Sequence, residues 1–516
     1  MSSIHSNPEG SRRDTRTGVQ VTARAPYNFV PLPDTVVAAP ERVDQDQYQP
    51  GTLTGRIVCQ LTTCSPTYIR GMLTAARWAA IGQKKPDAMS VDEKKEKAPF
   101  FSRFQTQNGQ PGVPELPGSS LRGMVRQMVE VISQAHMRWV ADEPTFMFRA
   151  VAAPGDDPLR DPYRDLIGAF ARNVKAGYLH QDSKKENWFI RPAQAPRQHN
   201  WPEKGAFLKV KERRIPDGAV TGLLRFDDPD YEPGYYEVTF DVAVQSGRQG
   251  KYLAITQIGD KGKGYPHHGV LVTSGNMLET GNPGQKSPRK NHALILPEDR
   301  KAGELPLSPQ VLRDYKAGLS PFQASLKGWG DDKGVLKDGA PVFYIMSGGQ
   351  IQAIGHNPNF RVPAQLNGSN RAANPADFVP ASLTAGGADI AERLFGYVEE
   401  EARTGLVAKR QKKPNGQEIV YRSEAGRVFF TNAQYEEDTD GIWYSDSPIP
   451  LKILAAPKPT TFQHYLVQDK DKGHNPDDKS QLAHYGTSPK ETQIRGYKHY
   501  WHKGKSPDIK ASGDDL

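Results

Sequence analysis

The residues best suited to bind a phosphate group stand at the start of an amphipathic segment, in the run PGSSLRG at residues 117–123. Ser119 or Ser120 can cap the predicted helix by accepting a backbone N–H bond. Arg122 and Arg126 follow in its first turns, off the apolar face. Unpaired N–H groups, the positive end of the helix dipole, hydroxyls and arginines together favour a phosphate site. The alternative is an ordinary capped helix with solvated arginines.

Two further segments have the composition of nucleic-acid contacts. Near the C-terminus, basic groups that can hold a phosphate backbone alternate with rings that can stack on bases. The candidates there are Arg495, Lys498, Tyr500 and Trp501. A glycine-rich turn at residues 259–265 lets the backbone approach phosphates and carries Lys261 and Lys263. The competing interpretations are an edge strand whose rings pack on the core, and a solvated loop.

Other chemistry has weaker support. Histidines such as His267, His268 and His499 could form acid/base pairs for RNA cleavage without a metal, but the sequence brings no pair together. Cys59 and Cys64, the only cysteines, lie in an apolar run and are expected to be buried free thiols. No metal ligands are assigned, and the P-loop spacing for nucleotide hydrolysis is absent.

The elements that must position these residues follow a simple order. Alternation of apolar and polar residues predicts a strand at 53–63, and a long polar loop at 82–114 includes a charged segment that could form a short helix. The amphipathic helix at 119–136 follows, and a second core helix is expected at 389–399. This order is typical of the first half of a β-α-β-β-α-β ferredoxin-like unit. The apolar face of the first helix comprises Leu121, Met124, Val125, Met128 and Ile132.

The long region between these helices is expected to be a β-rich insertion, because turn signals separate several apolar segments. Predicted strands occupy residues 206–210, 220–226, 235–244 and 252–258, and a hairpin joins 342–346 to 350–354.

Composition sets broad limits. A chain of 516 residues with 36% hydrophobic residues, 48 Gly and 42 Pro can form one large core or two to three small ones with many loops. The formal net charge of +8 weakly favours a polyanionic partner. No apolar leader or run long enough to span a membrane is visible, so a soluble, cytoplasmic protein without membrane contact is expected.

Six blocks in one order resemble the RAMP superfamily of CRISPR-associated proteins, and in particular a family associated with type III systems. These blocks are APYNFVPLP (25–33), PGSSLRG (117–123), DIAERLFG (389–396), GRVFFTNA (426–433), PKPTTF (457–462) and RGYKHYWH (495–502). Residues from about 140 to 385 contribute little to the resemblance.

The resemblance implies an α+β fold: a ferredoxin-like (RRM-like) RAMP core with a large β-rich insertion and extended termini. The expected segments are an extended arm (1–48), the first part of the core (49–138), the insertion with remaining core strands (139–387), the second part of the core (388–470), and a basic-aromatic C-terminal segment (471–516).

The resemblance also implies a function in antiviral defence, as a structural subunit that binds crRNA in a type III CRISPR-Cas effector ribonucleoprotein complex. The expected partners are crRNA, target RNA, other RAMP subunits and a large type III subunit. Binding of RNA would require no cofactor.

The alternative is a metal-dependent endoribonuclease subunit that cuts target RNA or precursor crRNA with Mg²⁺ or Mn²⁺. Catalytic backbone subunits of such complexes carry an aspartate in the loop before the first core helix. Here residues 100–108 contain no acid, and Asp87 and Asp92 lie further upstream. This departure favours RNA binding without cleavage.

Overall fold

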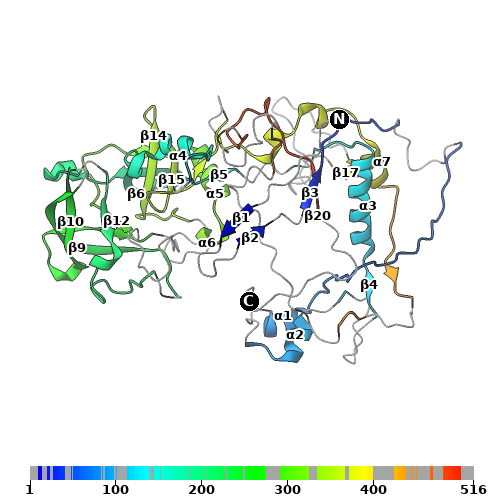
Figure 1. Cartoon of the computed structure of the whole chain (residues 1–516), viewed down its shortest axis with the longest axis horizontal. Helices are drawn as coiled ribbons and strands as arrows, with labels where there is room; N and C mark the ends of the chain where they lie inside the picture. The colour runs from blue at the N-terminus through cyan, green and yellow to red at the C-terminus, as the bar shows by residue number, and fades with distance from the viewer. Residues whose placement is uncertain are drawn as a thin grey trace. The chain divides into compact units, whose positions relative to one another are not determined.

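The computed structural model is a mixed α/β protein in which every described strand pair is antiparallel. It forms two compact units (Figure 1): unit 1 consists of residues 1–25, 140–379 and 458–494, and unit 2 of residues 26–139, 380–457 and 495–516. The structure describes residues 10–13, 20–23, 27–40, 48, 50–82, 84, 88–97, 100–101, 113–138, 140, 145–151, 153–184, 186–203, 205–226, 228, 230–247, 250–274, 291–324, 334–366, 371–398, 423–436, 443–445, 449, 465–468, 480 and 482–500.

Unit 1 contains two five-stranded sheets. The first has the order β10-β9-β11-β12-β8, with β8 Leu208–Lys211, β9 Tyr235–Gly247, β10 Gly250–Asp260, β11 His267–Val272 and β12 Asn291–Ile295. The second has the order β13-β7-β6-β14-β15, with β6 Lys175–Gln181, β7 Trp188–Pro192, β13 Leu305–Pro306, β14 Pro341–Ser347 and β15 Gln350–Gly355.

Shorter elements complete unit 1. Its paired short strands are β1 Gly10–Arg13 with β2 Gln20–Ala23, and β5 Met147–Phe148 with β16 Val362–Pro363. Its helices are α4 Arg160–Ile167, α5 Pro309–Ala317 and α6 Pro321–Ala324, with 3₁₀ turns η2 Ala169–Ala171, η3 Pro196–His199, η4 Glu212–Arg214, η5 Lys261–Lys263 and η6 Pro375–Phe378.

Two apolar clusters hold unit 1 together. One centres on the second sheet and includes Phe343 and Val342, and the other lies on the first sheet around Phe240 and Leu271. All four side chains are fully buried. Burial of such side chains is the main stabilising contribution to a fold of this kind.

The strand predictions for unit 1 are largely confirmed. β8, β9 and β10 overlap the strands predicted at 206–210, 235–244 and 252–258, and β14 and β15 form the expected hairpin. The hairpin turns at Gly348 and Gly349, whose φ angles of +55° and +79° favour glycine. The strand predicted at 220–226 is wrong. Gly222 there has a φ of +77°, and Leu223 N–H bonds back to the Val220 carbonyl, so the backbone turns instead of extending.

Unit 2 is built from helices and two-stranded ribbons in its described part. The ribbons are β3 Tyr27–Val30 with β20 Tyr497–Tyr500, β4 Glu115–Leu116 with β19 Ala433–Gln434, and β17 Tyr397–Val398 with β18 Ser423–Glu424. The helices are α1 Ala75–Ile81, α2 Val91–Lys97, α3 Gly118–Ile132 and α7 Ile390–Phe395, with the 3₁₀ turn η7 Ala381–Leu383.

Helix α3 confirms the main helix prediction, and α2 confirms the short charged helix. The second core helix is shorter than predicted, because Gly396 follows Phe395 with a φ of +76° and ends α7. That conformation is one that other residues rarely adopt.

The strand predicted at 53–63 is wrong. These residues have no secondary structure, and Leu53 and Ile57 are 99% and 89% exposed. An alternating run becomes a strand only when a neighbour bonds its backbone groups, and no described strand pairs with it. Cys59 and Cys64 are consequently exposed thiols, not buried ones.

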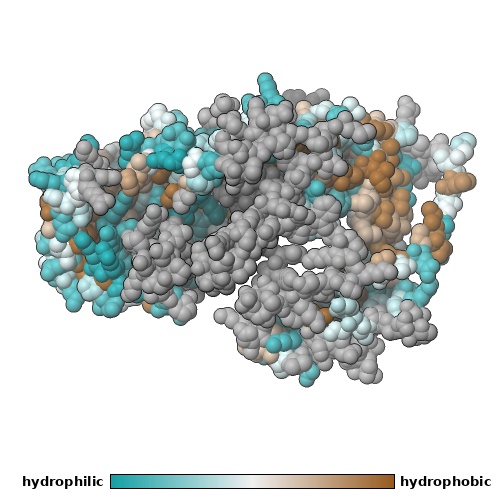
Figure 2. All heavy atoms as spheres, viewed as in Figure 1, coloured by the Kyte–Doolittle hydropathy of each residue, from teal (hydrophilic) through white to brown (hydrophobic). Residues whose placement is uncertain are grey.

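The predicted apolar face of α3 is also largely exposed. Met124, Met128 and Ile132 are 54%, 39% and 79% exposed. Figure 2 shows apolar side chains gathered over this helix.

Candidate nucleic-acid interface

The start of α3 is capped differently from the expectation. Its N-cap residue is Pro117, and no side-chain hydroxyl caps it. Instead, the Asn432 side-chain oxygen accepts the Gly118 N–H at 2.9 Å, and the Asn432 amide donates to Glu115 at 2.8 Å. The predicted Ser119/Ser120 cap is therefore wrong. A distant residue meets the N–H group, which leaves both serine side chains exposed in the first turn.

Gly118 is held close to the segment that supplies this cap. A Cβ atom at Gly118 would lie 2.3 Å from the Phe430 carbonyl oxygen. Only glycine fits so close a backbone approach. The blocks PGSSLRG and GRVFFTNA therefore meet at the start of α3.

Arg122 and Arg126 bind the end of α7. Arg122 donates from Nη2 to the Phe395 carbonyl, and its guanidinium lies 5.5 Å from the Phe395 ring centroid. Arg126 donates to the Gly396 carbonyl at 3.2 Å and to Glu130 at 2.8 Å. Carbonyls at a helix C-terminus lack helical partners and carry partial negative charge, which the two arginines match. Both side chains thus have protein partners at the predicted phosphate site.

The N-terminal and C-terminal blocks form one antiparallel ribbon, β3 with β20 (Figure 1). Tyr500 pairs with Tyr27, and Lys498 pairs with Phe29. Because side chains alternate between the faces of a strand, these four residues share one face of the ribbon. We call Tyr27, Phe29, Lys498 and Tyr500 the ribbon face.

The ribbon face combines rings with a cation. The Tyr27 and Tyr500 rings meet edge to face at 5.7 Å. The Lys498 ammonium lies 4.0 Å from the Tyr27 ring centroid and 4.9 Å from that of Tyr500. Tyr500 is 58% exposed, so part of this face is open to solvent. Bases of single-stranded nucleic acids stack on exposed rings, and their phosphates pair with neighbouring lysines.

Arg495 supports the ribbon from inside. Its side chain is buried, donates to the Asn28 side-chain oxygen at 2.8 Å, and lies 4.8 Å from the Phe29 ring centroid. Burial lowers the pKa of Arg495 to about 10, so the guanidinium stays charged at neutral pH. Gly496 follows with a φ of +121°, and a Cβ there would meet the Val30 carbonyl at 2.0 Å. Trp501 lies outside the described residues.

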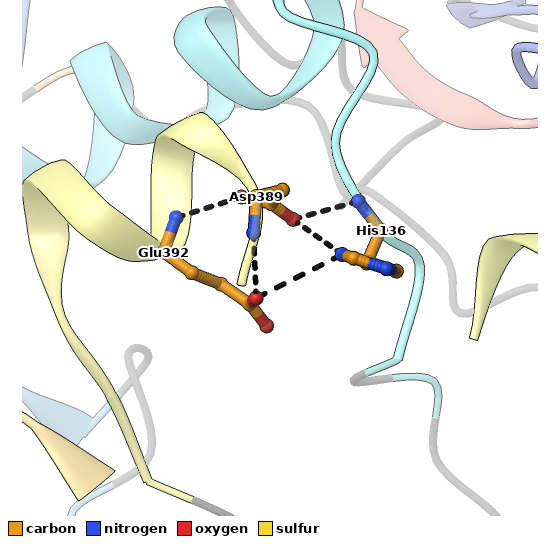
Figure 3. A group of neighbouring side chains, drawn as sticks. All are labelled: His136, Asp389 and Glu392. Atoms are coloured by element: carbon orange, nitrogen blue, oxygen red, sulfur yellow. Dashed lines mark hydrogen bonds and ion pairs between the residues drawn. The ribbon is translucent and has the colours of Figure 1, made fainter. Parts of the chain in front are cut away.

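A buried cluster of His136, Asp389 and Glu392 joins the end of α3 to the start of α7 (Figure 3). The Asp389 carboxylate accepts the Glu392 N–H at 2.7 Å and the His136 backbone N–H at 2.8 Å, while Glu392 accepts the Asp389 N–H at 3.1 Å. This reciprocal pair is a capping box. The His136 ring nitrogen Nδ1 lies 3.0 Å from Asp389 and 3.7 Å from Glu392.

An imidazole nitrogen and two carboxylate oxygens could hold a divalent metal such as Zn²⁺. The His136 ring, the Asp389 carboxylate and Oε2 of Glu392 already have hydrogen-bond partners, and Arg138 lies 3.5 Å from the buried Oε1 of Glu392 and supplies positive charge. Burial, and then the negative charge of Asp389, raise the pKa of Glu392. The cluster is explained as a helix cap, and we derive no metal chemistry from it.

The remaining predicted residues are spread over the chain. Asp92 is exposed in the first turn of α2, and Asp87 lies outside the described residues. Among the described residues, the His136 cluster is the one group of three potential metal ligands, and Asp92 is not part of it. Lys261 and Lys263 are exposed in η5 of unit 1, where Lys261 pairs with Glu237 at 2.8 Å.

Sequence reasoning missed several residues that build the interface. Asn28 and Phe29 lie inside a recognised block, and the alternation of Tyr27, Asn28 and Phe29 is a strand signal. Asn432 and Glu115 could not be found this way, because nothing local links an asparagine to a helix far along the chain.

Within the part of the chain that the structure describes, no helix is both long and apolar enough to cross a membrane. The comparisons with protein-family models and with curated proteins find no match for this chain.

Proposed function

We propose that this chain is a crRNA-binding structural subunit of a type III CRISPR-Cas effector complex that acts in cytoplasmic antiviral defence. The proposal includes a RAMP core of ferredoxin-like, RRM-like type within unit 2. Its partners would be crRNA, target RNA, other RAMP subunits and a large type III subunit.

The observation that carries the proposal is the meeting of distant sequence blocks. Of the six blocks that resemble RAMP proteins, PGSSLRG contacts both GRVFFTNA, through Asn432, and DIAERLFG, through Arg122; Arg126, just after the block, also contacts Gly396. The APYNFVPLP and RGYKHYWH blocks pair as β3 and β20. PKPTTF lies outside the described residues. A core built from the blocks of that family would require such contacts.

The ribbon face supports RNA as the ligand. Tyr27, Lys498 and Tyr500 offer stacking surface and positive charge at one place, and the exposed Ser119 and Ser120 hydroxyls offer hydrogen bonds at the start of α3. The rings can contact bases, and the lysine and the hydroxyls can contact the backbone. Single-stranded RNA is bound by this combination of contacts.

We propose that the chain does not cleave RNA. Asp92 projects from a surface helix, where its neighbour Glu93 pairs with Lys84 at 2.6 Å. Among the residues that the structure describes, nothing favours the endoribonuclease alternative, in which Asp87 or Asp92 would hold Mg²⁺ or Mn²⁺. The test is target-RNA cleavage by the assembled complex with Asp87→Ala or Asp92→Ala, with EDTA controls. Loss of one cut, with assembly retained, would establish catalysis.

RNA binding is tested by co-expression with a CRISPR array, purification and sequencing of the bound RNA. We expect guide RNA to be enriched. Lys498→Gln should weaken binding of purified chain to single-stranded RNA and reduce the salt dependence by about 0.7 in log–log slope per lost phosphate contact. Lys94→Gln, an exposed lysine on α2, is the matched control. Random cellular RNA, or equal effects of both variants, would contradict the proposal.

A further inference from the structure

Two arginines lie opposite each other at one end of the β5/β16 ribbon in unit 1. The two strands are antiparallel, with Phe148 opposite Val362. The next pair along the ribbon is therefore Arg149 opposite Arg361. Directly opposed residues lie on the same face of a ribbon, with Cβ atoms about 4.5–5.5 Å apart, and like charges in this position destabilise the pairing.

A tyrosine of α4 links the two arginines independently of the strand register. The Tyr163 hydroxyl donates at 2.9 Å to the carbonyl of Phe360, the residue directly before Arg361. The same hydroxyl oxygen accepts a hydrogen bond from the Arg149 side chain. Tyr163 is itself buried. The Arg149 side chain is thus held beside the backbone from which Arg361 projects.

The ribbon that carries the two arginines is shielded from water. All four residues of β5 and β16 are buried, and Arg149 and Arg361 are half-buried. Removal of water makes a charge costly and strengthens its repulsion by a like charge. The pKa of Arg361 is accordingly lowered, first by burial and then by the positive charge of Arg149.

No acid offsets this repulsion at Arg361. Among the described residues, its side chain forms no ion pair and no hydrogen bond, and no carboxylate counters the lowering of its pKa. Arg191, also half-buried in unit 1, instead pairs with Glu304 at 2.6 Å. An anion between the two opposed guanidinium groups would replace their repulsion with two attractions.

The donor geometry favours phosphate as this anion. A guanidinium group presents planar pairs of N–H donors that match two oxygens of a phosphate group. We propose that Arg149 and Arg361 form a binding site for a phosphate group, held between their guanidinium groups. The inference rests on the proposed function for the source of this phosphate, which is then the backbone of the bound RNA. Free phosphate is the other source.

RNA affinity tests this source. Arg361→Gln should weaken binding of a short single-stranded RNA by roughly 10- to 150-fold, as expected for loss of one charge-assisted contact. The log–log salt dependence should fall by about 0.7. Arg361→Lys, which keeps the charge but not the paired donors, should retain the salt dependence and lose part of the affinity. Arg300→Gln, which removes the same charge from an exposed arginine of unit 1, is the matched control.

Stability without RNA distinguishes a ligand site from a structural contact. Arg361→Gln should raise the melting temperature of the RNA-free chain, because the repulsion from Arg149 disappears, and about 1 M NaCl should reduce this difference. Inorganic phosphate should raise the melting temperature of the unaltered chain relative to sodium chloride of equal ionic strength, but not that of Arg361→Gln. A lower melting temperature for Arg361→Gln with unchanged RNA affinity would assign Arg361 to packing and overturn the inference. Stabilisation by phosphate with unchanged RNA affinity would overturn RNA as the source.

Chemical labelling tests the location without a substitution. Phenylglyoxal modifies accessible arginines and blocks tryptic cleavage after them, so modification of Arg361 joins peptides 338–361 and 362–371. We expect bound RNA to protect Arg361 and to leave Arg300 reactive. A reactive Arg361 in the RNA-bound chain would overturn the inference and leave the proposed function standing. Absence of RNA binding by the unaltered chain would overturn the proposed function, whereas stabilisation by phosphate through Arg361 would still establish the site.

Discussion

Units 1 and 2 are stabilised in different ways. Unit 1 buries apolar side chains on two five-stranded sheets, as around Phe343 and Phe240. The described part of unit 2 has two-stranded ribbons, and many of its buried side chains are polar or charged. These are Glu115, His136, Asp389, Glu392, Glu424 and Arg495.

The two units therefore depend in different ways on individual residues. An apolar core tolerates substitutions that conserve side-chain volume, because the hydrophobic effect is not directional. A buried polar network depends on every partner, because a buried group that loses its hydrogen bond retains its desolvation cost. The described part of unit 2 leaves an apolar helix face exposed while it buries several charges, whereas unit 1 buries Glu212, Asp314 and two histidines among a much larger number of apolar side chains.

The largest expected effect is in the core of unit 1. Phe343→Ala should lower the free energy of unfolding by about 3–5 kcal/mol, because it leaves a cavity in a fully buried site. Phe429→Ala in unit 2, where the ring is 88% exposed, should change it by no more than about 0.5 kcal/mol. Chemical denaturation with hydrogen-exchange mass spectrometry measures both. Equal losses of unfolding free energy in the two variants would contradict this difference between the units.

Acid should weaken unit 1 through two buried histidines. Burial lowers the pKa of both His292 and His356 to about 4. The folded state favours the neutral imidazoles. The free energy of unfolding is therefore at its full value above the unfolded-state pKa of about 6.5, and it decreases as the pH falls toward the folded-state pKa of about 4. Each shift corresponds to about 3 kcal/mol.

The opposite sign is expected at Glu392 in unit 2. Its raised pKa favours the protonated form in the folded state, so stability falls as the pH rises from about 4.3 through the folded value. Hydrogen exchange between pH 4 and 7 distinguishes the units. The comparison uses protection factors, which correct for the intrinsic slowing of amide exchange in acid. Protection in unit 1 that does not fall with acid, or that is unaffected by His292→Gln and His356→Gln, would contradict the assignment.

Arg122→Ala should destabilise unit 2 by about 1–3 kcal/mol, because the Phe395 carbonyl loses its donor. The sequence alone suggested little loss of fold, since Arg122 lies off the apolar face. The melting temperature and exchange of α7 peptides measure the effect, with Lys94→Ala on α2 as the control. Weaker RNA binding at an unchanged melting temperature would instead indicate that Arg122 binds an RNA phosphate.

The smallest effect is expected at the exposed face of α3. Ile132→Ser should change the free energy of unfolding by no more than about 0.5 kcal/mol, because the side chain is 79% exposed. A loss of more than about 1 kcal/mol would show that this face is covered in solution. Unit 2 would then resemble unit 1 in burying its apolar side chains.

Elements with local signals could be predicted from the sequence. Apolar segments between turn signals placed β9, β10 and the β14/β15 hairpin, and helical periodicity with turn residues placed α3. The blocks at the two ends of the chain were each recognisable as they stand. Such patterns arise from the periods of strand and helix, which are properties of neighbouring residues.

Which of these segments form paired elements, and what those elements contact, depends on the tertiary fold. The alternating run at 53–63 has no described partner strand, and the helix face with the clearest periodicity is exposed. Asn432, not a local serine, caps α3, and Arg122 meets the Phe395 carbonyl. The ribbon face exists only because the two ends of the chain pair. These contacts join groups that are distant in sequence, so their free energy depends on the whole fold and leaves no local pattern.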